Sequence, residues 1–263
     1  MFDSLINTLL VAAGFYVYLA LVRQISLREV NGAASLGEKQ FGLPEVIAAL
    51  LLVGWFLLNL SVAIRSGETV YRTRDLIVTG IFSLVVLSVL TSLLQFRGFS
   101  VSSLGGFSHL SFGRIVSTAA VLLLAAYPLL FVADEIAHWF LGSGSSRQQI
   151  VEMFTGSETL KQRVMIIVLA ISIAPLTEEF IFRFFLYGVL KRYLGRGAGL
   201  FLNALLFAAV HAHLPSFGPL FVLGSCLTLA YEWSGSILVS MTMHALFNFL
   251  SLSALAFPNL LPQ

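Results

Sequence analysis

The sequence predicts an all-α membrane protein, a polytopic bundle of about eight transmembrane helices. Two observations carry this prediction. Hydrophobic residues make up 58% of the 263-residue chain and charged residues 11%, whereas soluble domains contain about 25% charged residues. The mean hydropathy is +0.92, and the apolar residues gather in runs of about 20, the length that crosses the hydrocarbon core of a bilayer.

Eight apolar runs with polar connections between them give the candidate spans. The first run lacks a basic segment before it and a small-residue cleavage site after it, so we interpret it as a spanning helix rather than a signal peptide. The sixth run is short and is expected to be tilted or partly inserted. The predicted spans cover residues 4–22, 44–64, 76–96, 115–133, 164–190, 198–211, 217–233 and 236–255.

A polar break divides the chain in two. Gly-Ser-Gly-Ser-Ser at residues 142–146 predicts a flexible segment, and the polar stretch 147–163 predicts an amphipathic helix and a turn. We therefore expect one domain over residues 1–145, with the first four helices, and a second over residues 146–263. The polar clusters described below all fall in the second domain.

The charge and cysteine content limit the classes of function and partner that the chain could have. The formal net charge of +2 gives no indication of nucleic-acid binding. Cys226 is the single cysteine, so no intramolecular disulfide can form, and it is expected to be a small packing residue in a helix. The partner that the composition predicts is the lipid bilayer.

Two adjacent glutamates, Glu178 and Glu179, lie inside one of the most apolar runs. Membrane helices keep charge where it is paired or used. The alternative interpretation is a helix that restarts after Pro175 with acids in its first turn, but two carboxylates exceed what capping needs. Glu179 and Arg183 are four residues apart and share a helix face, so they can pair. Glu178 points about 100° away and is the freer carboxylate, suited to act as a general base on water.

Two later helices carry further polar groups, and together the three helices predict one site inside the bilayer. Asn203, Phe207 and His211 recur every four residues and form one stripe, in which Phe207 is expected to pack. His244 and Asn248 share a face of the last helix, where they can orient water, bind metal or donate to an oxyanion, or else tie helices together. A structural role is preferred for four others: His213 near a helix end, His109 and His138 in connecting segments, and Glu232, solvated at the interface.

These motifs resemble the CAAX-protease and bacteriocin-processing family of intramembrane proteases, also described as the abortive-infection family. The motifs Glu178-Glu179-x-x-x-Arg183, Phe207-x-x-x-His211 and His244-x-x-x-Asn248 agree in order and spacing, as does the Trp-Ser-Gly-Ser-Ile turn before the last helix. The likeness covers residues 164–255. One departure is Phe184, where the family usually has glycine, and this ring is expected to narrow the space beside the active helix.

The resemblance implies peptide-bond hydrolysis in or at the membrane, with residues 146–263 as the catalytic transmembrane domain. Glu178 would activate water with help from His211, and Glu179 with Arg183 would hold the helix geometry. The substrate would be a membrane-associated peptide or protein, which is prenylated in the eukaryotic members. The expected location is a bacterial plasma membrane.

His244 and Asn248 would stabilise the tetrahedral oxyanion in such an enzyme. The requirement for a metal is left open. Glu178, His211 and His244 can form a zinc site with an open position for water, and the family is often labelled metalloprotease. The same residues can also activate water directly, and the His-Glu-x-x-His motif is absent.

Two other functions stay open. A non-catalytic immunity or scaffold protein of the same fold would be expected to lack a catalytic group, and none is missing. A proton-coupled transporter could use the acids and histidines as a relay. Broken helices in matching positions of two halves would then be expected, whereas the polar residues cluster in one half.

Overall fold

The computed structural model describes residues 2–30, 41–66, 73–100, 105–107, 110–141, 154, 156–157 and 159–257. Within these ranges all regular structure is helical, which confirms the predicted fold class. Seven helices are long and apolar enough to cross a membrane. They are α1 (Phe2–Val30), α2 (Leu43–Ser66), α3 (Thr73–Phe96), α5 (Phe112–Leu141), the continuous helix from α7 (Leu160–Val168) to α9 (Tyr187–Leu194), α11 (Phe217–Ser234) and α12 (Ile237–Ala256).

The sixth predicted span is the exception. It corresponds to α10 (Arg196–Val210), an apolar helix of 15 residues. At about 1.5 Å per residue it is shorter than the hydrocarbon core of a bilayer. Seven of the eight predicted spans are therefore long enough to cross, and the short one is the helix that leads to His211.

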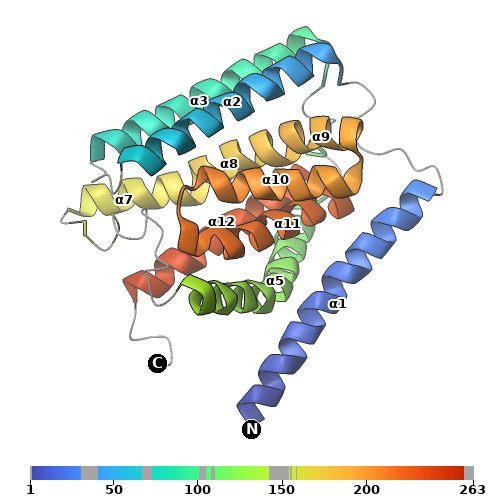
Figure 1. The fold of residues 1–263 in the computed structure, drawn as a ribbon, viewed down its shortest axis with the longest axis vertical. Helices are drawn as coiled ribbons and strands as arrows, with labels where there is room; N and C mark the ends of the chain where they lie inside the picture. The colour runs from blue at the N-terminus through green and yellow to red at the C-terminus, as the bar shows by residue number, and fades with distance from the viewer. Residues whose placement is uncertain are drawn as a thin grey trace.

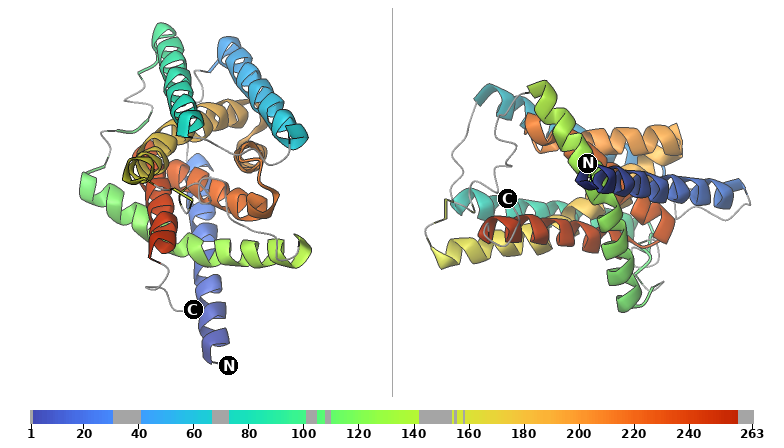
Figure 2. Two further views of the ribbon diagram at one scale, coloured as in Figure 1. Left: turned by 90° about the vertical axis from the view of Figure 1, so that its left-hand side faces the viewer. Right: turned by 90° about the horizontal axis from the view of Figure 1, so that it is seen from below.

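The second half of the chain forms the centre of the bundle (Figure 1). Helix α10 packs against α9 and α11, and α12 packs against α11 and α8 (Ala174–Glu179). Helix α5 closes the other side, where it contacts both α11 and α12 and runs across their direction (Figure 2). Helices α2 and α3 lie over the long helix α7–α9 on the side away from α5 (Figure 1).

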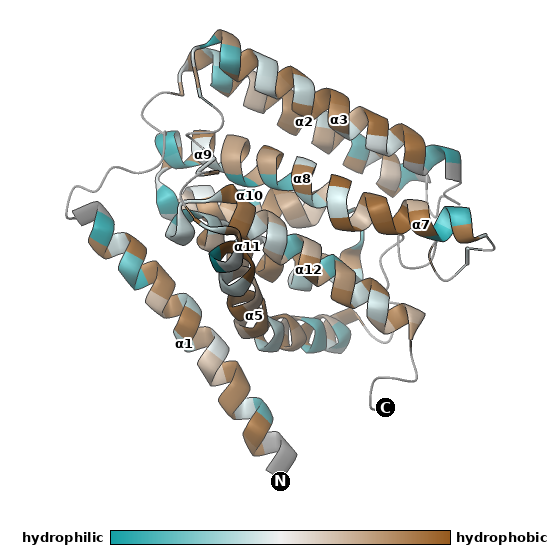
Figure 3. Ribbon diagram, turned by 180° about the vertical axis from the view of Figure 1, so that it is seen from behind, coloured by the Kyte–Doolittle hydropathy of each residue, from teal (hydrophilic) through white to brown (hydrophobic). Residues whose placement is uncertain are grey.

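Hydrophobic residues make up most of the helices, and hydrophilic residues gather near many of the helix ends (Figure 3). This distribution suits a bilayer, because a leucine or phenylalanine that faces lipid is not exposed to water and carries no penalty, whereas an unpaired charge in lipid is costly. The buried aromatic and aliphatic core includes residues of α5, α10, α11 and α12 and of the long helix that carries Glu178 and Glu179, called the glutamate helix below.

The long helix from Leu160 to Leu194 contains two π-helical segments, η2 (Leu169–Ile173) and η3 (Phe180–Leu186). The six residues of α8 between them carry both glutamates. The helix does not restart after Pro175, and the hydroxyl of Thr177 donates to the carbonyl of Ile173 at 2.8 Å instead of capping an end. π-helical segments such as η2 and η3 often occur at functional sites.

Helix α1 leans away from the bundle toward its N-terminus (Figure 1) but is held near its C-terminal end. The Tyr18 hydroxyl donates to the Leu122 carbonyl at 2.9 Å. Trp233 Nε1 donates to Gln24 Oε1 at 2.8 Å, and Arg196 Nη1 donates to Ser26 Oγ at 3.0 Å. The first contact attaches α1 to α5, and the other two attach it to the end of α11 and the start of α10.

Glu232 corrects the sequence interpretation. Its side chain is 7% exposed, not solvated. It accepts from Lys191 Nζ at 2.5 Å, from Arg196 Nε at 3.2 Å and from the Tyr187 hydroxyl. Lys191 and Arg196 are brought to it by the tight connection between α9 and α10, a tertiary contact that local sequence patterns do not reveal.

Helix α5 also differs from its prediction. It continues to Leu141, so His138 lies in a helix and not in a connecting segment. The apolar run ends near Ala133, but the helix extends beyond it with Asp134 and His138 one turn apart. The predicted break at 142–146, His109 and most of the stretch 147–163 lie outside the described residues, and the division at residue 145 stays a prediction.

Candidate active site

Glu179 and Arg183 form a buried ion pair. Arg183 Nη1 lies 3.0 Å from Glu179 Oε1, and both side chains have no exposed area. Arg183 Nη2 donates to the Gly224 carbonyl at 3.4 Å, and its guanidinium lies over the Phe207 ring, 4.1 Å from the centroid. The predicted pairing is confirmed, and Phe207 packs as expected. A buried arginine of this kind is tolerated because a carboxylate and a π face compensate its charge.

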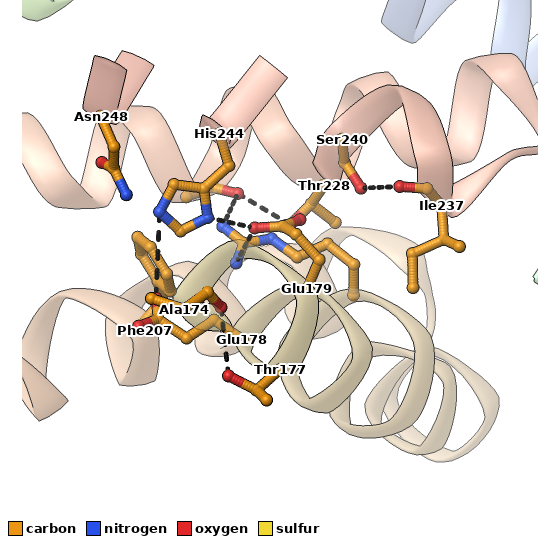
Figure 4. A network of polar contacts seen from close by, with 12 residues as sticks. Ala174, Thr177, Glu178, Glu179, Phe207, Thr228, Ile237, Ser240, His244 and Asn248 are labelled. Atoms are coloured by element: carbon orange, nitrogen blue, oxygen red, sulfur yellow. Dashed lines mark hydrogen bonds and ion pairs between the residues drawn. The ribbon is translucent and has the colours of Figure 1, made fainter. Parts of the chain in front are cut away.

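His244 occupies the other side of the same carboxylate. Its Nδ1 lies 2.8 Å from Glu179 Oε1. A carboxylate oxygen only accepts, so His244 Nδ1 carries the proton in this contact. Its Nε2 therefore faces Glu178, at 4.0 Å from Oε2. Figure 4 shows Glu178, Glu179 and His244 facing one another between α8 and α12. The contact between His244 and Glu179 was not predicted from the sequence.

Glu178 differs from its neighbour in its surroundings. Its side chain is 29% exposed, whereas Glu179 is fully buried. The Oε2 atom of each glutamate is buried without a hydrogen-bond partner among the described residues, but the Oε1 of Glu179 is held by both Arg183 and His244. Glu178 is thus the freer of the two carboxylates, as the helical spacing predicted.

His211 follows the last residue of α10. Its Nδ1 lies 2.7 Å from the Phe207 carbonyl, which accepts, so the proton is on Nδ1 and the lone pair is on Nε2. Ala212 then takes a left-handed conformation with φ of 50°, which costs about 1–2 kcal/mol in a non-glycine residue. Backbone strain of this kind is found next to functional groups when the surroundings enforce it.

His213 lies beyond that turn, not on the helix. It adopts an extended conformation before the short turn η4 (Leu214–Ser216). Its Nδ1 lies 2.8 Å from Ser216 Oγ. Its place near a helix end and its preferred structural role both agree with this local hydrogen bond.

Asn248 connects α12 to the π-helical segment η2. Its amide nitrogen donates to the Ala170 carbonyl at 2.7 Å. The sequence offered two roles for Asn248, tying helices together or donating to an oxyanion, and this contact corresponds to the first. An asparagine amide has two N–H donors, so one remains for a further acceptor.

Glu178, His211, His244 and Asn248 line one cavity of about 650 Å³. Its volume falls within the range of small-molecule and cofactor sites, about 300–1,000 Å³. The predicted convergence of the three polar clusters is confirmed, while the catalytic roles of these residues stay predictions. Ala170 and Ala174 continue the face of Glu178, and their small side chains leave room beside it.

Two sets of residues around the site were missed. Tyr127, Leu130, Phe131 and Asp134 of α5 form a wall of the cavity. Their i, i+3, i+4, i+7 spacing is the signal that identifies one helix face, but sequence alone does not say what that face meets. Behind the site, the Asn203 amide donates to Thr228 Oγ1 at 3.2 Å, and Thr228 donates to the Gly224 carbonyl at 2.8 Å. This chain of hydrogen bonds reaches Arg183 through the same carbonyl.

Phe184 does not narrow the cavity, contrary to expectation. It is buried and does not line the cavity. Its ring stacks on Phe180, with centroids 4.9 Å apart, and meets Phe41 edge-on at 6.3 Å. The Phe41 ring also sits against Gly188, where a Cβ would meet it at 2.5 Å. Phe184 therefore belongs to the packing between the glutamate helix and the start of α2.

The carboxylate and imidazole groups of the cavity do not form a ready metal site. Among the described residues, no group of three His, Cys, Asp or Glu side chains is arranged to hold a metal ion. His244 directs one ring nitrogen to Glu179, and the gap of 4.0 Å between its other nitrogen and Glu178 suits two groups that share a small polar molecule. The predicted zinc site of Glu178, His211 and His244 thus stays a prediction.

These observations define a polytopic helical membrane protein with an acid- and histidine-lined cavity inside the bundle. Residues 160–250 match the model of the family described as Type II CAAX prenyl endopeptidase Rce1-like. The match confirms the resemblance seen in the motifs, and with the seven apolar helices it indicates a multi-pass integral membrane protein with a CAAX-protease-like fold. No curated protein and no solved structure matches the chain.

Proposed function

We propose that the protein is an intramembrane endopeptidase that hydrolyses a peptide bond in a membrane-associated protein or peptide, using water activated by Glu178. One observation carries the proposal. Glu178, His211, His244 and Asn248 come from three helices and line one cavity. The family match over residues 160–250 supports the same class of reaction.

Glu178 acts as the general base in this mechanism. Its carboxylate takes a proton from water while the water oxygen forms a bond to the scissile carbonyl carbon, and the carbonyl oxygen becomes an oxyanion. His211 assists, because its Nε2 lone pair can accept the second O–H of the same water. The C–N bond then breaks, and the proton held by Glu178 passes to the leaving nitrogen. The products are a carboxylic acid and an amine.

Asn248 and His244 are the groups proposed to stabilise the oxyanion. Asn248 has an amide N–H beyond the one donated to Ala170. His244 directs Nδ1 to Glu179 and can donate from Nε2 in the form of the ring that carries a proton on both nitrogens. Donors fixed before the reaction stabilise developing charge at no cost of reorganisation.

Glu179 and Arg183 are proposed to position the site and not to react. Glu179 fixes the His244 tautomer and ring orientation, as a carboxylate does for a catalytic histidine. Arg183 compensates the charge of Glu179 and is itself held by Gly224 and Phe207. In this mechanism the protein's own side chains activate the water, since the described residues do not present a ready set of metal ligands. We also propose a bacterial plasma membrane as the location, in keeping with the compact chain.

The proposal is tested with purified protein in liposomes that contain a library of single-span membrane-anchored peptides, with cleavage sites read by mass spectrometry. The wild type should cleave, and Glu178→Gln should reduce the rate by about 10²–10⁴-fold while retaining its fold. Glu135→Gln is the matched control, because Glu135 is an exposed glutamate of α5 that does not line the cavity. A wild type that cleaves no peptide, or a Glu178→Gln protein with full activity, would refute the proposal.

A further inference from the structure

Helix α5 contributes a wall of the cavity from outside the segment that matches the family. The match begins at residue 160, whereas Tyr127, Leu130, Phe131 and Asp134 lie on α5. The first three give an apolar surface. Asp134 adds a carboxylate to the same face, one turn beyond Leu130 and Phe131.

Asp134 lies beside the turn that follows His211. Helix α5 contacts η4 in this turn, and a Cβ at Gly218, near the start of α11, would lie 3.5 Å from the Ala133 carbonyl. The carboxylate is therefore at the part of the cavity that the His211 connection encloses. Glu135, the next residue, is exposed and does not line the cavity.

The surroundings of Asp134 leave it able to bind a cation. Its side chain is 41% exposed, and Oδ2 lies 3.7 Å from His138 Nε2, longer than a hydrogen bond. The rest of the cavity is largely aliphatic and aromatic. A substrate carboxylate at this position would be repelled by Asp134, and an apolar side chain would desolvate it without compensation. A lysine or arginine side chain would gain a charge-assisted hydrogen bond and keep its stem on apolar surface.

We propose that Asp134 is a specificity determinant that selects a substrate with lysine or arginine at one fixed position near the scissile bond. This inference rests on the proposed peptidase function and adds the chemical class of the substrate to it. Asp134 acts through recognition and not through the reaction, so its replacement should alter which peptides are cleaved while basal hydrolysis continues.

The test compares peptides that differ at one residue. Cleavage sites from the liposome library are aligned, and the peptide cleaved fastest is remade with lysine, methionine or glutamate at the enriched position. For the wild type, kcat/KM should be higher for lysine than for methionine. Asp134→Asn should lower that ratio by about threefold to tenfold, and Asp134→Lys should favour the glutamate peptide. Glu135→Gln should keep the wild-type ratio.

A second measurement separates recognition from hydrolysis. Binding of the same three peptides is measured by photo-crosslinking to Glu178→Gln, with and without Asp134→Asn, and the lysine preference should vanish with Asp134. Cleavage without a basic preference, or a preference that survives Asp134→Asn, overturns the assignment and leaves the peptidase intact. Absence of any wild-type cleavage refutes the peptidase. If no cleavage is seen but binding shows a lysine preference that Asp134→Asn abolishes, cation recognition by Asp134 is still supported. Binding that shows no lysine preference overturns cation recognition as well.

Discussion

Glu179 Oε1 accepts from His244 Nδ1 at 2.8 Å. The same oxygen lies 3.0 Å from Arg183 Nη1, so one buried atom joins the histidine of α12 to the arginine one turn away. The two adjacent glutamates are separated by this relationship. Glu179 is fully buried and its Oε1 is held by both side chains, whereas Glu178 is 29% exposed; the Oε2 atoms of both glutamates have no hydrogen-bond partner among the residues described.

The two glutamates should therefore respond differently to the same substitution. Glu179→Gln leaves Arg183 buried without its counter-charge and should lower the free energy of unfolding by about 3–5 kcal/mol. Glu178→Gln should stay close to the wild type in stability. Both proteins are heated in detergent, and the monodisperse fraction is followed by gel filtration. Equal melting of the two variants would contradict the assignment.

Removing both partners of the buried pair should cost less than removing one. Arg183→Met alone leaves the buried Glu179 carboxylate with the ring N–H of His244 but without its counter-charge, while the double variant Glu179→Gln, Arg183→Met removes both charges of the pair. The double-mutant cycle should give a coupling of about 1–3 kcal/mol in the same melting assay. Additive losses would show that the pair is not coupled.

Asn248→Ala should affect turnover far more than stability. The variant loses the hydrogen bond to Ala170, worth about 1 kcal/mol, and one oxyanion donor, worth about 10²–10³-fold in kcat. The measurement combines kcat from the liposome assay with melting of the same preparation. A loss of melting temperature with unchanged kcat per folded molecule would assign Asn248 to helix tying alone.

Glu232→Gln should destabilise the protein without changing the chemistry. Lys191 and Arg196 lose the carboxylate that they share, at a cost of about 3 kcal/mol, while the cavity does not include Glu232. Melting in detergent and kcat at low temperature are compared with Glu135→Gln, an exposed change expected within about 0.5 kcal/mol. If Glu232→Gln melts like the wild type, the result would support the interpretation of Glu232 as a solvated surface residue.

Treatment with a chelator tests the zinc alternative. Because no three ligating side chains are arranged for a metal among the described residues, hydrolysis should persist after dialysis against a chelator. Metal content is measured on the same sample. Loss of activity that zinc restores would instead support a site formed by Glu178, His211 and His244 on binding.

Hydropathy and residue spacing predicted the structural features that depend on a single segment of the chain. The long apolar runs were identified because a bilayer demands continuous apolar length, and Glu179 with Arg183 was identified because four residues make one turn. The clustering of Glu178, His211, His244 and Asn248 followed from the cost of placing such groups against lipid.

The contacts that the sequence did not predict join distant segments. His244 meets Glu179 from 65 positions away, and Lys191 meets Glu232 across 41. Asp134 was overlooked because the apolar run ends just before it, although α5 continues as a helix. Phe184 was misplaced because its direction depends on Phe41, which belongs to another helix connection.

The two π-helical segments determine where the glutamate helix can gain or lose a residue without moving the site. A π turn bonds residue i to i+5, so it accommodates one residue more than an α turn. Losing one residue within Leu169–Ile173 would therefore convert η2 to α-helix with little rotation of the residues beyond it, and Glu178 would stay in the cavity. A loss of one residue within the α-helical turn Ala174–Glu179 would instead turn the glutamates by about 100° relative to the segment before them. Relatives that share the site are therefore expected to differ in residue count within the π-helical segments and not within α8.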